Sequence, residues 1–398
     1  MMLLAHGAVG CGAFAPSFRI EPPGFVQGVE SFTSLHLCTN IEPSDLEDSG
    51  DAKLERALEE AFALFPLAHG AVVANEDPTT LMGADIHRIV TAKSKRFAKP
   101  VIAASQLTSA PGSAAAIAVK TAGKYCTISR SNAHAVAIPF QREASGMVWF
   151  VAKLLREIGL DPVLEFTGAS ASDLACIAGC KLVIGFTPEI GVPLDYMPWS
   201  SAQHISRWFG MPLVWTCFNS PSATDASLRA IAAQFGRRIQ RRTEAVIAAN
   251  RERIDALLAH YRPRFENRLM VHFQDEPETS LECYRLLGFR IGNRKGWPGK
   301  TGVWRTPRMV FDPRDPSDKA LRAYVADAKP DFILCDRRDV FEARKFGQAT
   351  MIFSPFFDQY GNTAWGYDGF ACLAAELDRA VGAPWRKLVR PPWPVESG

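Results

Sequence analysis

Short apolar runs alternate with longer amphipathic stretches along most of the chain. Apolar runs at residues 70–74 and 100–104 have the length of buried strands, and residues 85–98 between them carry helical periodicity. A second amphipathic stripe, over residues 53–65, ends at Pro66. This strand–helix–strand order predicts a parallel sheet with helices on both faces.

The same alternation recurs twice more. A second unit has predicted strands at 133–139, 162–166, 181–186 and 212–217, and a third unit has strands at 269–273, 332–335 and 350–353. The carboxyl ends of parallel strands are where ligand sites gather in such sheets. We therefore expect an α/β protein with three Rossmann-like, doubly wound parallel-sheet domains around a central cleft.

Composition shifts set the predicted domain boundaries. A passage rich in Gly, Ser, Ala and Thr (105–121) closes the first unit, and a long helical stretch interrupted near Gly236 follows the second. The arginine-rich segment at 290–316 reads as a long loop. The expected division is a first domain at 1–125, a second at 126–222, a connecting helix at 223–265, and a third domain with a C-terminal tail at 266–398.

Composition and charge exclude several classes of protein. Of the 398 residues 47% are apolar and 22% charged, and the net charge is +3, as in a globular protein without a general affinity for nucleic acid. The arginines of the connecting helix alternate with acidic residues, which is typical of a solvated helix. No apolar run reaches the ~18 residues that cross a bilayer. Nine scattered cysteines fit a reducing, cytoplasmic location.

The first candidate for chemistry is Cys11, which stands in the motif His6-Gly7-Ala8-Val9-Gly10-Cys11-Gly12 after an apolar strand. A thiolate presented at a tight glycine turn suits an iron–sulfur ligand. Spacing alone favours a buried free cysteine, because one cysteine does not make a cluster site. Cys176 and Cys180 are four residues apart on a predicted helix, but no third ligand follows, so we expect them to pack in the core.

The motif around Cys11 resembles the His-Gly-Pro-Val-Gly-Cys-Gly motif of the nitrogenase component 1 family, in the alpha subunit of its molybdenum–iron protein. Further stretches are similar to that family: Ser227-Leu228-Arg229-Ala230-Ile231-Ala232-Ala233-Gln234-Phe235, Tyr261-Arg262-Pro263-Arg264, Gly366-Tyr367-Asp368-Gly369-Phe370-Ala371, Pro384-Trp385-Arg386-Lys387-Leu388 and Pro392-Trp393. The resemblance runs from about Leu3 to Trp393, so the chain is identified as an alpha-subunit-like member.

The resemblance implies an iron–sulfur cluster shared with a partner subunit. In the family the cysteine that matches Cys11 ligates the P-cluster at the boundary with the beta subunit. Residues 77–85 resemble a second ligand motif of the family, with Asp77 in place of the motif's cysteine. The family segment that bears a further cysteine has no match in this sequence. A carboxylate can bind iron, as in the related dark-operative protochlorophyllide reductase, although thiolates suit such clusters better. Asp77 also reads as a turn residue before Pro78, and Cys38 is a candidate displaced ligand.

The same resemblance predicts that no molybdenum or vanadium cofactor binds in the usual way. Gly185 and Phe356 stand at the family's cofactor-ligand positions, and neither side chain can ligate a metal. Residues 274–277 are acidic where the family seats an anionic cofactor with a glycine–arginine loop. We expect apolar side chains to line the vacated space, namely those of Phe353, Phe356, Phe357 and Trp365. The space either takes an organic molecule or is filled by the phenylalanines.

The resemblance implies an alpha-like subunit of a nitrogenase-like oxidoreductase that pairs with a beta-like component 1 subunit. In the family a separate ATP-dependent iron protein supplies the electrons, and this chain has no phosphate-binding loop with which to hydrolyse ATP itself. We expect no activity from the chain alone, and no dinitrogen reduction. The alternative is a non-catalytic, degenerate paralogue that acts in metallocluster assembly, or a truncated gene product.

Overall fold

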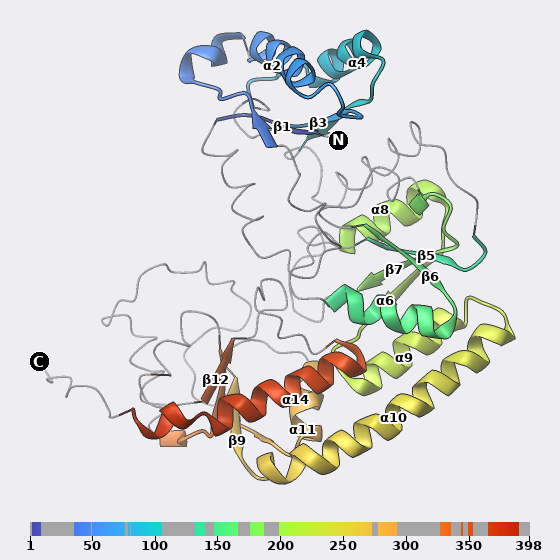
Figure 1. Ribbon diagram of the computed structural model, residues 1–398, viewed down its shortest axis with the longest axis vertical. Coiled ribbons are helices and arrows are strands. Elements are labelled where there is room, and N and C mark those ends of the chain that lie inside the picture. The colour runs from blue at the N-terminus through green and yellow to red at the C-terminus, as the bar shows by residue number, and fades with distance from the viewer. Residues whose placement is uncertain are drawn as a thin grey trace, which may run out of the picture. The chain divides into compact units, whose positions relative to one another are not determined.

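The computed structural model is α/β (Figure 1). It describes residues 2–8, 36–48, 50–75, 79, 81–105, 132–139, 147–165, 176–186, 199–272, 278–292, 327–335, 344, 349–352 and 365–389. These residues contain three four-stranded sheets in which every strand pair is parallel. The predicted α/β class with three parallel sheets is confirmed.

The first sheet has the order β2-β1-β3-β4. Its strands are β1 (Met2–His6), β2 (His36–Cys38), β3 (Ala71–Asn75) and β4 (Val101–Ser105), and its helices are η2 (Pro43–Asp48), α2 (Asp51–Leu64) and α4 (Ile86–Phe97). On α2 the apolar residues at helical spacing are the buried ones, Leu54, Leu58, Ala61 and Phe62. They join Met2, Leu4 and Val73 in one core cluster, which fixes the helix on the sheet.

The second sheet has the order β6-β5-β7-β8. Its strands are β5 (Ala135–Pro139), β6 (Asp161–Glu165), β7 (Leu182–Phe186) and β8 (Leu213–Thr216). Every residue of the central strands β5 and β7 is buried, which explains their unbroken apolar sequences. Helix α8 (Trp199–Phe209) packs on this sheet through Ala202 and Ile205.

The third sheet has the order β10-β9-β11-β12. Its strands are β9 (Leu269–His272), β10 (Arg290–Ile291), β11 (Phe332–Cys335) and β12 (Ala349–Ile352), with α11 (Glu278–Leu286) between the first two. The prediction of loop from residue 290 was wrong at its start. Arg290 N donates to Arg268 O at 2.9 Å and Gly292 N to Met270 O at 2.7 Å, so these residues form an edge strand.

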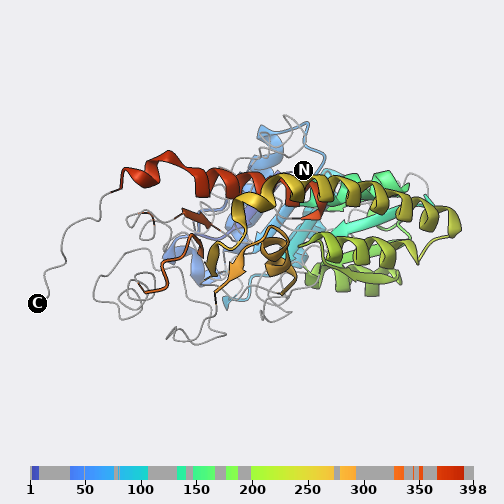
Figure 2. The same cartoon turned by 90° about the horizontal axis from the view of Figure 1, so that it is seen from below.

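The remaining helices are α6 (Met147–Ile158), α9 (Pro221–Ala232), α10 (Arg237–Phe265), α14 (Gly366–Gly382) and the 3-10 helix η4 (Pro384–Lys387). Figures 1 and 2 show α14 alongside α10. The predicted interruption of the connecting helix near Gly236 is confirmed, since α9 and α10 are separate helices. No helix among the described residues is long and apolar enough to cross a membrane.

The chain divides into two compact units. The first comprises residues 1–144, 159–187 and 192–216, and the second comprises residues 145–158, 188–191 and 217–398. Helix α6 therefore belongs to the second unit, where it packs on α10 and α14, although the strands before and after it in sequence belong to the first. The boundaries of the domains expected from the sequence stay a prediction.

All three sheets share one strand order. In each, the second strand in sequence pairs with one side of the first strand, and the third and fourth strands are added on the other side. The order therefore reverses between β1 and β3 in the first sheet, between β5 and β7 in the second, and between β9 and β11 in the third. Ligands of open parallel sheets bind outside the carboxyl ends of the strands at this point. The carboxyl ends of these strand pairs are therefore the places to look for a site.

Candidate functional site

Polar side chains gather at the carboxyl edge of the first sheet. β1 ends at His6, β2 at Cys38 and β3 at Asn75. The strand register pairs His6 with Asn75 and Ala5 with Cys38, so the three strand ends lie next to one another. His6 is completely buried and Asn75 is 3% exposed, in a part of the sheet where apolar residues would be expected.

Two threonines tie these strand ends together. The hydroxyl of Thr39 accepts from Gly7 N at 3.1 Å and lies 3.2 Å from Nδ1 of His6. The hydroxyl of Thr79 lies 2.8 Å from the carbonyl oxygen of His6 and 2.6 Å from Oδ1 of Asn75. Thr39 and Thr79 are 4% and 0% exposed, so this buried polar network holds the end of β1 in one geometry.

The thiol of Cys38 lies at the same edge. It donates to the carbonyl oxygen of Gly7 at 3.4 Å and accepts from Asn40 N at 3.3 Å. Cys38 is a half-buried free cysteine. Of the predicted metal ligands it is the one inside the described residues, and it contacts the backbone of the segment that leads to Cys11.

The N-terminus of helix α2 lies close to the ring of His6. Its N-cap, Gly50, has φ 72°, a left-handed conformation that glycine adopts without strain. A Cβ at this position would lie 2.7 Å from Cδ1 of Ile41 and 3.2 Å from Cε1 of His6. The glycine is therefore required both by the backbone and by the closeness of the imidazole.

The other predicted ligands of this site lie outside the described residues. These are Cys11, which follows the end of β1, and Asp77, which follows the end of β3. Phe356 and the acidic stretch at 274–277 also lie outside them. Within the described ranges, no group of three or more His, Cys, Asp or Glu side chains could hold a metal ion.

Gly185 lies on β7, one residue before the strand ends, and is paired in register with Trp215 of β8. A Cβ at Gly185 would lie 2.6 Å from both Cε3 and Cζ3 of Trp215 and 3.2 Å from Cδ1 of Leu213. The hydroxyl of Thr216 donates to the Gly185 carbonyl oxygen at 2.9 Å. The side chains that lie closest to this position, Trp215 and Leu213, are not metal ligands, so they do not fit a metal cofactor anchored at residue 185.

Cys176 and Cys180 lie at the end of the segment that precedes β7. Cys180 is buried, and its Sγ lies 3.6 Å from the carbonyl oxygen of Cys176. Burial is the main cause that raises the pKa of Cys180 to about 12, with smaller contributions from Cys176 and Asp161. A thiol that stays protonated and packs in the core of the second sheet is a poor metal ligand.

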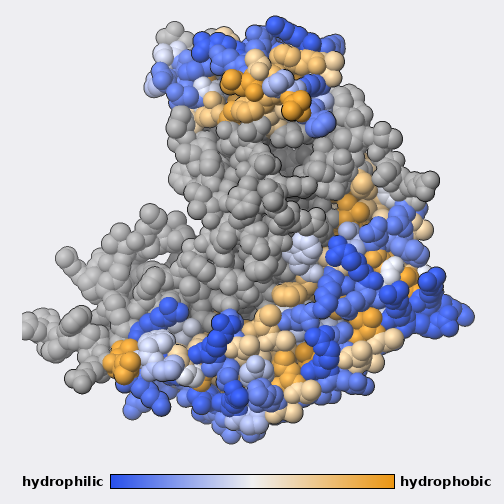
Figure 3. Space-filling view, in the orientation of Figure 1, coloured by the Kyte–Doolittle hydropathy of each residue, from blue (hydrophilic) through white to orange (hydrophobic). Residues whose placement is uncertain are grey.

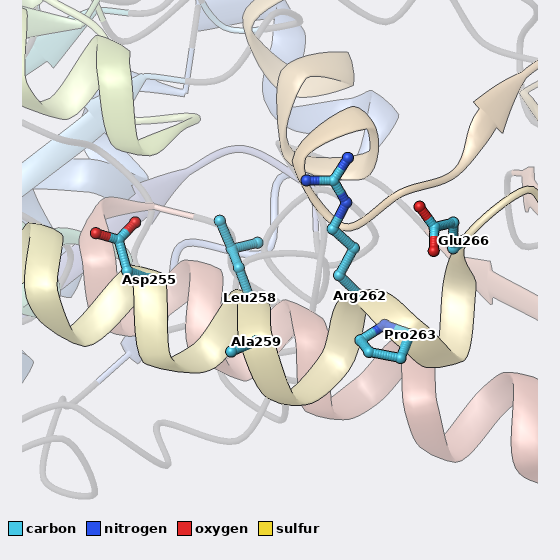
Figure 4. Close-up of a pocket in the computed structure, with 6 residues that line it drawn as sticks. All are labelled: Asp255, Leu258, Ala259, Arg262, Pro263 and Glu266. Atoms are coloured by element: carbon cyan, nitrogen blue, oxygen red, sulfur yellow. The ribbon is translucent and has the colours of Figure 1, made fainter.

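The surface of α10 has a depression but no enclosed site. Figure 4 shows the residues that line this depression, which project from the C-terminal part of α10 and its C-cap: Asp255, Leu258, Ala259, Arg262, Pro263 and Glu266. All of these except Leu258 are exposed. Figure 3 shows hydrophilic residues interspersed with hydrophobic ones over the visible face of this unit. A ligand here would contact one helix face, which makes the strand ends the better candidate.

The sequence alone did not point to Thr39, Thr79 or Trp215. Threonines are common at strand ends and helix starts, so nothing distinguished these two before the strand register was known. For Trp215 a signal existed. A glycine inside a fully apolar strand often marks a close approach by another group. The next strand in the sequence, β8, carries the tryptophan that makes this approach.

Comparisons with known proteins agree with this fold. The family model described as "Nitrogenase component 1 type Oxidoreductase" matches residues 1–381. The nitrogenase molybdenum–iron protein alpha chain of Nostoc sp. (strain PCC 7120) is 28% identical over 422 residues, covering 99% of this chain and 82% of the relative. The alpha chain of Azotobacter vinelandii is also 28% identical over 422 residues, covering 100% of this chain and 83% of the relative.

A solved structure extends the likeness to three dimensions. The structure of nitrogenase Cp1 at pH 5 matches with a TM-score of 0.68 at 18% identity, covering 99% of this chain and 87% of that chain. At that identity the match shows the fold. Because the family model covers nearly the whole chain, this protein belongs to the nitrogenase component 1 type oxidoreductases.

Proposed function

We propose that this chain is the alpha-like subunit of a nitrogenase-like oxidoreductase complex. It pairs with a beta-like component 1 subunit, receives electrons from an ATP-dependent iron protein, and shares an iron–sulfur cluster with its partner. Cys11 is the principal ligand from this chain, with Asp77 and Cys38 as further candidates. The complex is cytoplasmic, in keeping with free thiols such as Cys38 and Cys372.

The observation that carries this proposal is the pairing of the strand ends at His6 and Asn75. In the sequence Cys11 follows His6 and Asp77 follows Asn75. The two segments that carry the candidate ligands therefore start from paired residues on neighbouring strands. The hydroxyl of Thr79, just beyond Asp77, also reaches the carbonyl oxygen of His6 at 2.8 Å. The proposal therefore assigns Asp77 to the same site as Cys11.

Exposed apolar side chains beside this edge support a partner subunit. Leu81 is 79% exposed and Met82 is 47% exposed, and both follow the segment of Asp77. Contiguous exposed apolar surface marks protein–protein contact sites, and Leu81 and Met82 are adjacent in sequence. In the proposed complex the beta-like subunit covers them and supplies the remaining cluster ligands.

The proposed complex has no iron–molybdenum or iron–vanadium cofactor of the usual kind. The family's anchoring cysteine is represented here by Gly185, and the side chains closest to it, those of Trp215 and Leu213, are not metal ligands. This argues against dinitrogen as substrate and leaves the shared cluster as the redox group that the chain helps to hold.

Iron analysis of the complex tests the proposal. The chain is co-expressed with a beta-like partner and purified without air, and iron, molybdenum and vanadium are measured per chain. We expect iron in the wild-type complex without stoichiometric molybdenum or vanadium. Cys11→Ala should lose most of the iron, whereas Cys372→Ala, which removes an exposed cysteine on α14, should keep it.

Two outcomes contradict the proposal in different ways. Full iron content in the Cys11→Ala complex would show that Cys11 has a structural role. A wild-type complex that forms but holds no iron would favour the alternative of a non-catalytic chain in cluster assembly. Asp77→Ala and Cys38→Ala then show whether either side chain contributes to a cluster held by Cys11.

A further inference from the structure

We infer that Trp215 closes the position at which relatives anchor their metal cofactor, so that Gly185 and Trp215 form a coupled pair. The inference rests on the proposed function in one respect, the matching of Gly185 with the family's anchoring cysteine. Its physical content concerns two neighbouring strands of this chain. In this chain the indole of Trp215 occupies the volume that a cysteine side chain at residue 185 would need.

The strand register places both residues on the same side of the sheet. Gly185 and Trp215 are direct partners on the parallel strands β7 and β8. Side chains of paired residues in a parallel sheet point to the same face. Leu213, two residues before Trp215, and Val183, two residues before Gly185, both belong to the core under α8. The indole therefore continues that face toward the carboxyl ends of the strands.

The distances leave no room for even one carbon atom. A Cβ at Gly185 would lie 2.6 Å from two ring atoms of Trp215, well inside the roughly 3.5–4 Å of an ordinary carbon contact. These atoms belong to a rigid ring, so a small rotation of a chain end cannot relieve the clash. A cysteine would place a larger sulfur atom beyond this Cβ. The thiolate of the family's anchor and the indole of Trp215 thus compete for one volume.

Restoring the ligand alone is therefore expected to fail. Gly185→Cys must displace the indole, which is half-buried. Trp215→Ala removes the obstacle and leaves space beside the strand. The two substitutions should then be strongly non-additive, because each changes the cost of the other.

A double-mutant cycle on the purified full-length chain tests this coupling without any metal. Stability is measured by denaturant unfolding for Gly185→Cys, Trp215→Ala and the double variant. In the wild-type background Gly185→Cys should lower the folding equilibrium constant roughly 5- to 150-fold, as overpacking of a core does. In the Trp215→Ala background the same substitution should change it by less than about threefold.

Matched variants keep the test decisive. Gly185→Ala adds only the methyl group, so it should show the same dependence on Trp215 even if Gly185→Cys does not fold. Gly236→Cys is the control, because a Cβ there meets no atom within 4 Å and its φ of −69° suits any residue. Its effect should be small and equal in both backgrounds.

The inference is overturned if Gly185→Cys and Gly185→Ala are as stable as the parent, or if their costs are the same with and without Trp215. Because no metal or partner enters the experiment, its result is independent of whether the complex binds iron.

Discussion

The phenol of Tyr367 donates a hydrogen bond to Oδ1 of Asp225, and this bond joins α14 to α9. The other carboxylate oxygen of Asp225 accepts from Nε and Nη2 of Arg251 on α10, at 2.9 and 2.6 Å. Tyr367 is 2% exposed and Asp225 is 6% exposed. Burial, followed by the contact with Asp225, raises the pKa of Tyr367, so the phenol remains a donor at neutral pH.

Loss of that donor should destabilise the second unit. We expect Tyr367→Phe to lower the free energy of unfolding by about 1–3 kcal/mol, because a buried carboxylate loses a hydrogen bond. Arg264→Ala removes an ion pair with Asp378 whose side chains are 46% and 33% exposed, and should change stability by less than about 1 kcal/mol. Urea titrations of both variants measure the free energy of unfolding. Equal decreases in the two variants would show that the buried hydrogen bond stabilises the unit no more than the exposed ion pair does.

The acid stability of the chain should depend on Asp368. This residue accepts from Lys153 on α6 and from Arg253 on α10, the latter at 2.8 Å. Burial alone would raise its pKa, but the hydrogen bonds from Lys153 and Arg253 outweigh burial and hold the pKa below the ordinary value of 3.8. The unfolded chain then binds this proton more readily than the folded chain does.

The direction in which stability changes with pH follows from this difference in pKa. The stabilisation by Asp368 is fully present above its ordinary pKa of 3.8 and is lost as the pH falls through the lower value of the folded state. Unfolding midpoints of the wild type should therefore fall in this range more steeply than those of Asp368→Asn. Parallel pH profiles of the two proteins would contradict the assignment.

The N-cap of α2 offers a test of the packing over His6. Gly50→Ala and Gly83→Ala both place alanine at a positive φ, 72° and 78°, which costs roughly 1–2 kcal/mol in each case. At Gly83 nothing lies within 4 Å of the added methyl, whereas at Gly50 it meets Ile41 and the His6 ring. We expect Gly50→Ala to cost a further ~0.5–1.5 kcal/mol for the displaced side chains. Equal unfolding free energies would show that the space over His6 is loose.

The proposed partner surface can be tested at opposite ends of one strand. Leu81 follows the carboxyl end of β3 and Leu67 precedes its start, and they are 79% and 91% exposed. Both Leu81→Asp and Leu67→Asp should leave the fold intact, within about 0.5 kcal/mol, because neither side chain packs in the core. Only Leu81→Asp should reduce co-purification of the beta-like subunit. An equal effect of the two variants would place the interface elsewhere.

The alternation of strands and helices predicted the three parallel sheets because that pattern is local and each element carries its own periodicity. Sequence periodicity did not identify β2 or β10, since strands of three and two residues are too short to show a period. The long helix was predicted to be interrupted near Gly236 and to continue to residue 265, and α10 does end at Phe265 with Pro263 inside it. Pro263 lies in the last turn, where one lost hydrogen bond falls on the exposed side of the helix.

The candidate site was less predictable, because it depends on register between distant strands. Cys38 could be named as a ligand, but its contact with Gly7 follows from the pairing of β1 with β2. Gly185 could be named as a departure from the family's pattern. The tryptophan beside it became visible only when β7 and β8 were aligned.

Helix α6 also determines when this protein can finish folding. Its apolar side chains, among them Val151 and Leu155, are completely buried, and it packs on α10 and α14. On the ribosome α6 emerges long before residues 366–382 of α14 have been made. At ordinary rates of synthesis the delay is on the order of tens of seconds. During that time the apolar stripe of α6 lacks its final neighbours, so the nascent chain depends on chaperones or provisional contacts until its last helix arrives.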